Sequence, residues 1–587
     1  MQALVIYQGR LLNSKIDAFK EKYKFERIDK LNLKLSERRV SEDNFNYDKF
    51  CHDELKSEVN RSYDLIIIHL NLSDYDYGEM YGLRVACHLR LTTELQNTHS
   101  QIIILSSDSF EDIMRINPLG SILLTPGTQL SSEFDFTFEF DTKKISESHY
   151  QVFLNKINFP NPDNTDNRHS IANELSLFLW SKAIGLDLNS LDQEISTNLY
   201  YKWVSSTRRD ISIASINEKL RDQIIKIGVE GELNIVLIDD EAEKGWEKFY
   251  RHLFNLMGSQ NSKIEFHSIC VEKGSTQEDI VNFCTRKIEG AIKTPHVVLL
   301  DLRLVDSDFN NSPTESLTGI RIAKGIEEYN KAIQIIFTTA SNKVSSYISA
   351  SKKGLGVDGY IIKYPSENVE NSILNVVNSI VSAQSKSQFL LSVQSRIEKI
   401  MRLFPKTEEI QDENIQEFYE ESEASIKLAF DILYKAGNDE QFINIAYLEM
   451  FKVLENYSKR SDILEVTNLG VKVHNSGKTK SKDVLFIKDS SYSKNLSEWS
   501  KIITNEKAFT SNKINFNALE KVRNRVYLIL WFRNKVSDKN IDWHNLNDHR
   551  NNIAHGWDTD TSKSPQEWVK FLLDLILFMM DRRNEKI

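Results

Sequence analysis

The stretch VVLLDLRL (297–304) opens with four consecutive apolar residues and continues with an aspartate at position 301. Three more short apolar runs, at 233–238, 333–337 and 360–362, lie on either side of it. Continuous apolar runs are typical of parallel strands that are buried on both faces of a sheet. Because helix-like segments separate these runs, the sequence predicts a doubly wound α/β domain of the flavodoxin-like kind at residues 231–384.

The first 130 residues repeat this plan in a weaker form. Four of their blocks follow one another in the order of similar blocks in the second region: DLIIIHLNL (64–72), YGLRVACHL (81–89), QIIILSSDS (101–109) and SILLTPG (121–127). Their counterparts are VVLLDLRL (297–304), TGIRIAKGI (318–326), QIIFTTAS (334–341) and GYIIKYP (359–365). The shared order predicts an internal duplication, with another doubly wound domain at residues 1–130.

The 587 residues are too many for one hydrophobic core, and three or four domains are expected. After about residue 385 the apolar spacing is helical, apart from a possible hairpin near 463–488, and a last helix is predicted to begin at the N-cap Ser564. We therefore expect four parts: residues 1–130, a linker or helical region at 131–230, residues 231–384, and a mostly α-helical domain at 385–587.

The composition is that of an ordinary globular protein. The formal net charge of -10 gives no overall attraction to nucleic acid, so a site for a polyanion would have to be local. The four cysteines lie far apart and form no CxxC pair, which favours reduced thiols. The most apolar stretch, 568–580, is too short to cross a bilayer. The sequence therefore predicts a cytoplasmic protein without a membrane segment.

Polar residues follow the predicted strands of the second region at their carboxyl ends. They are Asp239, Asp240 and Glu241 after the first strand, Asp301 after the third, Thr338 and Thr339 after the fourth, and Lys363 after the fifth. Open α/β sheets form their ligand sites at this edge. A cluster of carboxylates suits Mg²⁺, and a carboxylate placed beside Mg²⁺ can attack a phosphoryl donor.

These residues resemble those of the response-regulator receiver family. The resemblance implies that Asp301 is the phosphoacceptor and that Thr339 and Lys363 bind the phosphoryl group. It also implies a Mg²⁺ site made by Asp239, Asp240, Asp301 and the backbone carbonyl of Arg303. The expected partner is a histidine kinase or a phosphorelay protein. A receiver fold that no longer accepts phosphate is the alternative.

The first region lacks these residues. Tyr7 and Gln8 stand where the acidic pair is expected, His69 replaces the acceptor, and Thr125 replaces the lysine. Metal binding there would lack its ligands. We therefore interpret residues 1–130 as a degenerate receiver-like domain that is used for contact.

A second informative segment, NLNDHRNNIAHGWD, lies near the end of the chain. It predicts a short helix that Asn547 or Asp548 caps and that Gly556 ends. Within this helix Asn551 and His555 are four residues apart and share one face, and Arg550 flanks them. Arginine can neutralise charge on phosphorus and histidine can transfer protons near neutral pH, so the group suits cleavage of a phosphodiester.

The sequence RNNIAHG (550–556) resembles the HEPN superfamily of all-α domains. The resemblance implies a metal-independent endoribonuclease without a cofactor, in which Arg550, Asn551 and His555 are catalytic and RNA is a possible substrate. It also implies a composite site at a homodimer interface. Glu455 is a candidate for the acidic residue that family members often carry on an earlier helix.

Taken together, these features predict a phosphorylation-regulated effector of a two-component-type pathway, with endoribonuclease activity in bacterial stress or phage defence. The alternative is a non-enzymatic signalling adaptor, in which receiver phosphorylation controls dimerisation or partner binding. A DNA-binding regulator is a third possibility, which the acidic composition disfavours.

Overall fold

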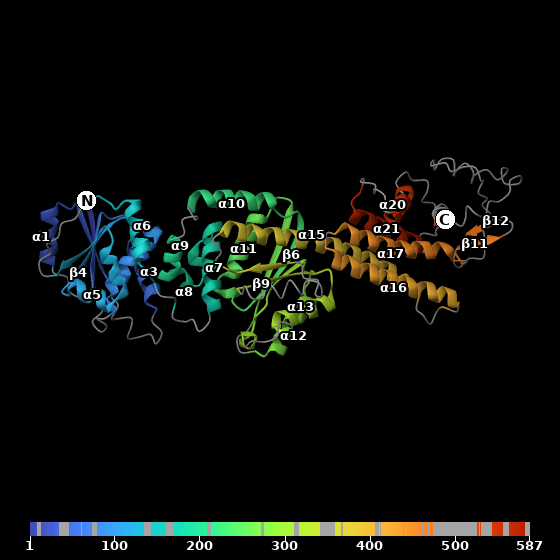
Figure 1. Cartoon of the computed structure of the whole chain (residues 1–587), viewed down its shortest axis with the longest axis horizontal. Helices are drawn as coiled ribbons and strands as arrows, with labels where there is room; N and C mark the ends of the chain where they lie inside the picture. Colours follow the sequence, from blue (N-terminus) through green and yellow to red (C-terminus); the bar gives the residue numbers. More distant parts are fainter. Residues whose placement is uncertain are drawn as a thin grey trace.

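The protein is an elongated chain of α/β and helical parts that follow one another along its longest axis (Figure 1). The computed structural model describes residues 1–8, 13–33, 46–59, 61–72, 79–133, 143–159, 162, 168–207, 213–271, 275–309, 316–340, 359–364, 368–405, 410, 412–437, 439–460, 462–467, 470–473, 525–526, 529, 543–555 and 563–581. Within these residues, two five-stranded parallel sheets precede a helical C-terminal part.

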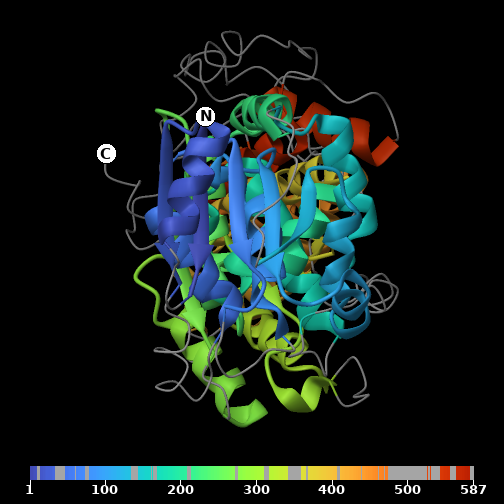
Figure 2. The ribbon, with the colours of Figure 1, turned by 90° about the vertical axis from the view of Figure 1, so that its left-hand side faces the viewer.

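The first sheet contains strands β1 (Gln2–Tyr7), β2 (Arg27–Asn32), β3 (Leu65–His69), β4 (Gln101–Ser106) and β5 (Thr128–Ser132). All pairings are parallel and the strand order is β2-β1-β3-β4-β5. One face packs against α1 (Asn13–Tyr23), and the other packs against α3 (Tyr47–Glu58) and α4 (Tyr81–Leu91). Figure 2 views the molecule with this sheet nearest to the reader. We call β1–β5 and these helices, with α5 (Phe110–Ile116), the first α/β unit.

The second sheet repeats this topology. Its strands are β6 (Gly231–Asp239), β7 (Ser262–Cys270), β8 (Val297–Asp301), β9 (Gln334–Thr339) and β10 (Gly359–Ile362), in the order β10-β9-β8-β6-β7. Helices α12 (Gln277–Glu289) and α13 (Thr318–Tyr329) cover one face, and α11 (Trp246–Met257) and α15 (Val369–Met401) cover the other. We call this the second α/β unit. Its topology confirms the expectation of two doubly wound sheets.

The fifth strand of the first sheet differs from the prediction. Residues 118–124 form a 3-10 helix that begins at Pro118. The side chain of Asn117 caps it by accepting the backbone N–H of Leu119. Proline favours the first position of a helix because its fixed φ suits the turn and its missing N–H would be unpaired there. The strand follows at β5, so the block SILLTPG (121–127) is not the counterpart of the last strand in the second sheet.

Among the described residues, five α-helices connect the two sheets, and together they contact the cores of both. These intermediate helices are α6 (Glu147–Lys156), α7 (Arg168–Ile184), α8 (Gln193–Thr197), α9 (Leu199–Thr207) and α10 (Ile213–Ile227). Residues of α7 and α10 enter the core that α11 and α15 form on the second sheet. There the indole of Trp180 meets that of Trp246 edge to face, with ring centroids 5.6 Å apart. Leu199 of α9 belongs to the core of the first unit.

The C-terminal part is built around α15, α16 (Glu413–Ala436), α17 (Glu440–Lys459), α20 (Trp543–His555) and α21 (Pro565–Met580). A short antiparallel hairpin, β11 (Leu464–Thr467) with β12 (Gly470–Val473), follows α17. Helix α15 has 33 residues, so it is about 50 Å long. Its first half packs on the second sheet and its second half joins the C-terminal core. Position 384, an expected domain limit, therefore lies inside one continuous helix.

The start of α21 was predicted correctly and the start of α20 was not. Ser564 caps α21, and Glu567 completes a capping box, as predicted. Helix α20 begins at Trp543, so Asn547 and Asp548 lie inside it and the prediction of a cap there is wrong. Gly556, the expected end, lies outside the described residues. Among the described helices, none is long and apolar enough to cross a membrane.

Candidate functional site

Three aspartates meet at the carboxyl edge of the second sheet. Asp239 ends β6, Asp240 follows it, and Asp301 ends the neighbouring parallel strand β8. Each offers a carboxylate oxygen, and these oxygens all lie within 4.8 Å of one another. Asp239 is fully buried, while 13% of the Asp301 side chain is exposed. The sequence therefore predicted this cluster from strand ends alone, and the structure brings its members together.

Lys363 faces the cluster from the strand at the other side. It follows β10, is fully buried, and forms ion pairs with Asp239 and, at 3.0 Å, with Oδ2 of Asp301. Its ammonium group also lies 4.9 Å from the centre of the Trp246 ring. Burial disfavours the charged lysine, but the two aspartates outweigh it and raise the pKa of Lys363 above its ordinary value. Lys363 therefore remains a cation.

One lysine does not balance three carboxylates. Burial, together with the charges of Asp301 and Asp239, raises the pKa of Asp240 to about 8. Burial likewise raises the pKa of Asp301 to about 6, against the influence of Lys363. Such shifts mark a site that lacks positive charge. Because Mg²⁺ prefers carboxylate oxygens and supplies the missing charge, Asp239, Asp240 and Asp301 fit a Mg²⁺ site.

The turn after β8 fixes the carboxylate of Asp301. The backbone N–H of Arg303 donates to Oδ1 of Asp301 at 3.1 Å. Gly319, in the first turn of α13, lies against the same turn, and a Cβ atom there would collide with the backbone of Asp301 and Leu302. The missing side chain therefore allows α13 to begin directly beside the carboxylate.

The predicted phosphoryl-binding threonine lies at the end of β9. Thr338 pairs in register with Asp301, and Thr339 pairs with Ile362 on the other side. The carbonyl of Thr339 accepts the backbone N–H of Lys363 at 2.7 Å. Both threonines are buried. The end of β9 thus lies between the strands that carry Asp301 and Lys363.

Helix α7 contributes polar contacts to the loop after β6 that the sequence did not predict. Asn173 accepts the indole N–H of Trp246 at 3.1 Å and donates to the carboxylate of Glu241. Lys244 forms ion pairs with Glu174 at 2.9 Å and with Glu241 at 2.8 Å. These contacts hold the loop that follows Asp240. No motif marks α7 in the sequence, because its role depends on long-range packing.

The first sheet reproduces the geometry of this edge without its chemistry. His69 ends β3 as Asp301 ends β8, and Gly82 lies against its backbone as Gly319 does against that of Asp301. Burial lowers the pKa of His69, which keeps the imidazole neutral. Nε2 of His69 is buried without a hydrogen-bond partner among the described residues. Tyr7 ends β1, where the second sheet has Asp239.

In the first sheet, the position that corresponds to Lys363 of the second sheet is occupied by Glu133, not by Thr125. The N–H of Glu133 donates to the carbonyl of Ser106 on β4, just as Lys363 donates to Thr339 on β9. Thr125 follows the 3-10 helix, and its hydroxyl donates to the carbonyl of Ile122. The first sheet therefore replaces the lysine with an acid. The similarity of SILLTPG to GYIIKYP concealed this because both contain a short apolar run.

The second predicted site lies on the surface of α20. Arg550 donates from Nη1 to Oδ1 of Asn551 at 3.1 Å, and its guanidinium carbon lies 5.7 Å from the centre of the Phe451 ring on α17. His555, at the end of the helix, is exposed. Glu455 lies one turn beyond Phe451 on α17, where it forms an ion pair with Lys459 at 3.4 Å. The structure thus places the three predicted residues on one accessible helix.

Comparison with known proteins finds a family to which the first α/β unit is similar. Residues 20–131 match a family model described as iREC, the Inactive Receiver domain. Among the curated proteins we found no match to this chain. The match begins in α1 and ends in β5, and it does not include the second sheet. The first α/β unit is thus similar to inactive receiver domains, which points to a signalling-related role.

Proposed function

We propose that the chain is a signalling protein whose second α/β unit accepts a phosphoryl group on Asp301. The observation that carries this proposal is the set of contacts around one carboxylate. Oδ1 of Asp301 accepts an N–H from Arg303, Oδ2 pairs with Lys363, and two further carboxylates lie within 4.8 Å. These contacts support the assignment of Asp301 as a nucleophile beside a cation, with the neighbouring carboxylates as ligands of a metal ion.

Each group has a defined task in the transfer. A carboxylate oxygen of Asp301 forms the new bond to phosphorus, and the bond from phosphorus to the donor's leaving group breaks, with its electron pair going to that group. Lys363 and the hydroxyl of Thr339 bind the oxygens of the transferred group. Asp239, Asp240, Asp301 and the carbonyl of Arg303 would hold Mg²⁺, which would supply positive charge beside those oxygens.

The proposal is tested with acetyl phosphate, a small phosphoryl donor, and the full-length chain. We expect Mg²⁺-dependent incorporation of one phosphoryl group, detected by intact-protein mass spectrometry and by gels that retard phosphoproteins. Asp301→Asn should abolish it. His69→Ala, at the equivalent position of the first sheet, should leave it unchanged. Labelling that survives in Asp301→Asn, or its absence from the wild type with Mg²⁺, would refute the proposal.

We further propose that the C-terminal part is the output, with metal-independent cleavage of RNA by Arg550, Asn551 and His555. The observation that favours this second function is their common location on α20, where His555 is exposed and Arg550 and Asn551 are half-buried. A single histidine can act as acid or base but not as both at once, so a second copy of the chain would complete the site. The resemblance to HEPN domains supports the same assignment.

Cleavage of a labelled RNA pool, measured with and without acetyl phosphate and Mg²⁺, tests this output. We expect His555→Ala to lower the rate by about 100-fold or more, the range of a general acid or base. His252→Ala, on α11 of the second unit, serves as a control. Equal cleavage by His555→Ala rules out the site. If a dimeric wild type does not cleave in either state, the result would favour the non-enzymatic adaptor.

A further inference from the structure

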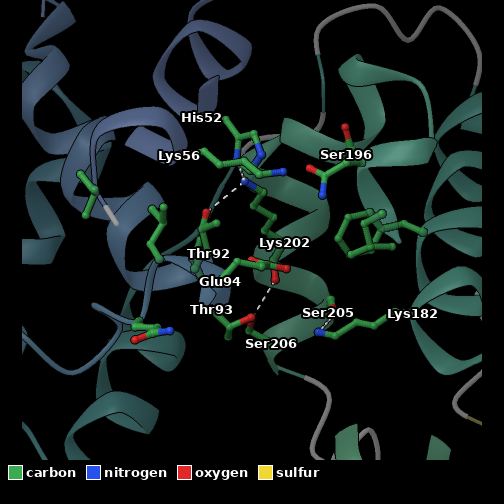
Figure 3. A pocket seen from close by; sticks show the side chains of 17 residues that line it. His52, Lys56, Thr92, Thr93, Glu94, Lys182, Ser196, Lys202, Ser205 and Ser206 are labelled. Atoms are coloured by element: carbon green, nitrogen blue, oxygen red, sulfur yellow. Dashed lines mark hydrogen bonds between the residues drawn. The ribbon is translucent and has the colours of Figure 1, made fainter. Parts of the chain in front are cut away.

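A cavity of about 200 Å³ lies between the first α/β unit and the intermediate helices (Figure 3). Two separate parts of the chain form its walls. The polar groups that matter here are His52, Thr92 and Glu94 from the first unit and Lys182, Lys202 and Ser205 from the intermediate helices. The family match ends at residue 131, so only one wall belongs to the matched region.

Lys202 in this cavity is buried and Lys182 is half-buried, and neither has a carboxylate among its described hydrogen-bond partners. The ammonium group of Lys202, on α9, lies 3.0 Å from Nδ1 of His52 and 3.0 Å from the hydroxyl of Thr92. Lys202 exposes only 7% of its surface. Lys182, on α7, donates to the hydroxyl of Ser205 at 2.6 Å. Figure 3 shows Lys202 reaching across to Thr92 of the first unit, and Lys182 beside Ser205 within the intermediate helices.

The charges in the cavity do not balance. Lys56, Lys182 and Lys202 line it, and Glu94 is the one acidic residue among the described lining residues. Burial lowers the pKa of both Lys182 and Lys202 to about 8, and Glu94 acts in the opposite direction on each. Both remain mostly charged at pH 7. Two ammonium groups that share the influence of one carboxylate leave an excess of positive charge away from water, which costs free energy and indicates that an anion completes the site.

His52 supports the same conclusion. Its side chain is 92% buried, since the residue exposes 8% of its surface, and burial together with Lys202 lowers its pKa to about 3. The neutral ring accepts from Lys202 at Nδ1, so Nε2 carries the hydrogen. That Nε2 atom is buried without a hydrogen-bond partner among the described residues. His52 therefore offers an N–H donor beside the ammonium group of Lys202.

We propose that this cavity binds a small dianion, and that the class of ligand which fits it best is a phosphate monoester with a few carbon atoms. Two ammonium groups, an imidazole N–H and several hydroxyls match the acceptor oxygens of a phosphate. Its volume is slightly larger than a cavity of about 150 Å³ that holds one benzene. A whole nucleotide is therefore too large.

One helix, α7, connects the cavity with the edge of the second sheet that carries the acidic cluster. Lys182 is near the end of α7, and Asn173, nine residues earlier, donates to Glu241 beside Asp240. Nine residues of helix span about 14 Å. A ligand that draws Lys182 towards the first unit would act on a helix that also contacts the loop of the acidic cluster.

Isothermal titration of the full-length chain tests the proposal, with inorganic phosphate, glycerol 3-phosphate and succinate as probes. Mg²⁺ is omitted, so that the acidic cluster repels each dianion. We expect saturable binding of at least one probe and at least about tenfold weaker binding by Lys182→Met and by Lys202→Met. Lys226→Met removes the same charge from an exposed position on α10 and should bind as the wild type does.

A further variant tests the sign of the charge effect. Glu94→Gln removes the acidic lining residue, so it should bind the same probe more tightly than the wild type. This variant keeps the proposal testable if a lysine variant fails to fold, which circular dichroism would reveal. The proposal is wrong if no probe binds the wild type. It is also wrong if the folded lysine variants bind with unchanged affinity.

Discussion

At the scale of single residues, strand ends were sufficient to predict the acidic cluster, and the reason is geometric. Parallel strands with the same order bring their carboxyl ends to one edge, so Asp239, Asp301 and Lys363 had to meet once the strands were correct. Glu133 could not be found in this way. Its position depends on where β5 begins, and the preceding 3-10 helix has as many apolar residues as a strand.

Asp240 gives the sharpest prediction at this scale. Its pKa of about 8 in the folded state exceeds the ordinary carboxyl value of about 4. Between about pH 4 and pH 8, Asp240 therefore keeps its proton in the folded state but has lost it in the unfolded state. This group therefore lowers stability progressively as pH rises through that window. Without Mg²⁺, Asp240→Asn should raise the stability of the second unit at pH 8 by about 1 kcal/mol or more, and by less at pH 6.

Thermal unfolding at both pH values, followed by hydrogen exchange in β6 and β8, measures this effect. Asp222→Asn, an exposed carboxylate on α10, controls for the change in net charge. Mg²⁺ should stabilise the wild type more at pH 8 than at pH 6, because its ligands must lose their protons. If the Asp240→Asn protein were less stable than the wild type at pH 8, repulsion from Asp239 and Asp301 would not destabilise the Asp240 carboxylate.

At the scale of elements, the apolar strands of the second sheet were predictable, whereas the edge strand β7 and the bridging helices were not. Residues 297–300 are fully buried, so their apolar run is continuous. Strand β7 lies at the sheet edge and is mostly half-exposed, which leaves the mixed sequence SKIEFHSIC without a clear signal. Helices α7 and α10 were expected only as a linker or helical region, since nothing local shows that they would cover the second sheet.

At the scale of the whole molecule, α15 is the element through which the second unit and the C-terminal part share a core. Gln384, at its middle, donates to the backbone carbonyls of Glu230 and Glu232 at the start of β6. Phe389 and Leu390, one turn further on, belong to the C-terminal core. Because packed helices shift as rigid bodies, a change at the face of the second unit would move the base of the C-terminal helices.

Interrupting α15 between its two halves therefore separates reception from output, provided that Asp301 is the acceptor. Ser385 is exposed at this junction, so Ser385→Pro removes a helical hydrogen bond at a cost of about 3 kcal/mol without disturbing either core. We expect Ser385→Pro to accept the phosphoryl group as the wild type does. In the wild type, but not in this variant, phosphorylation should change hydrogen exchange in α16, α17 and α21. Ser385→Ala keeps the helix and should behave as the wild type, whereas an unchanged response in Ser385→Pro would exclude α15 as the connection.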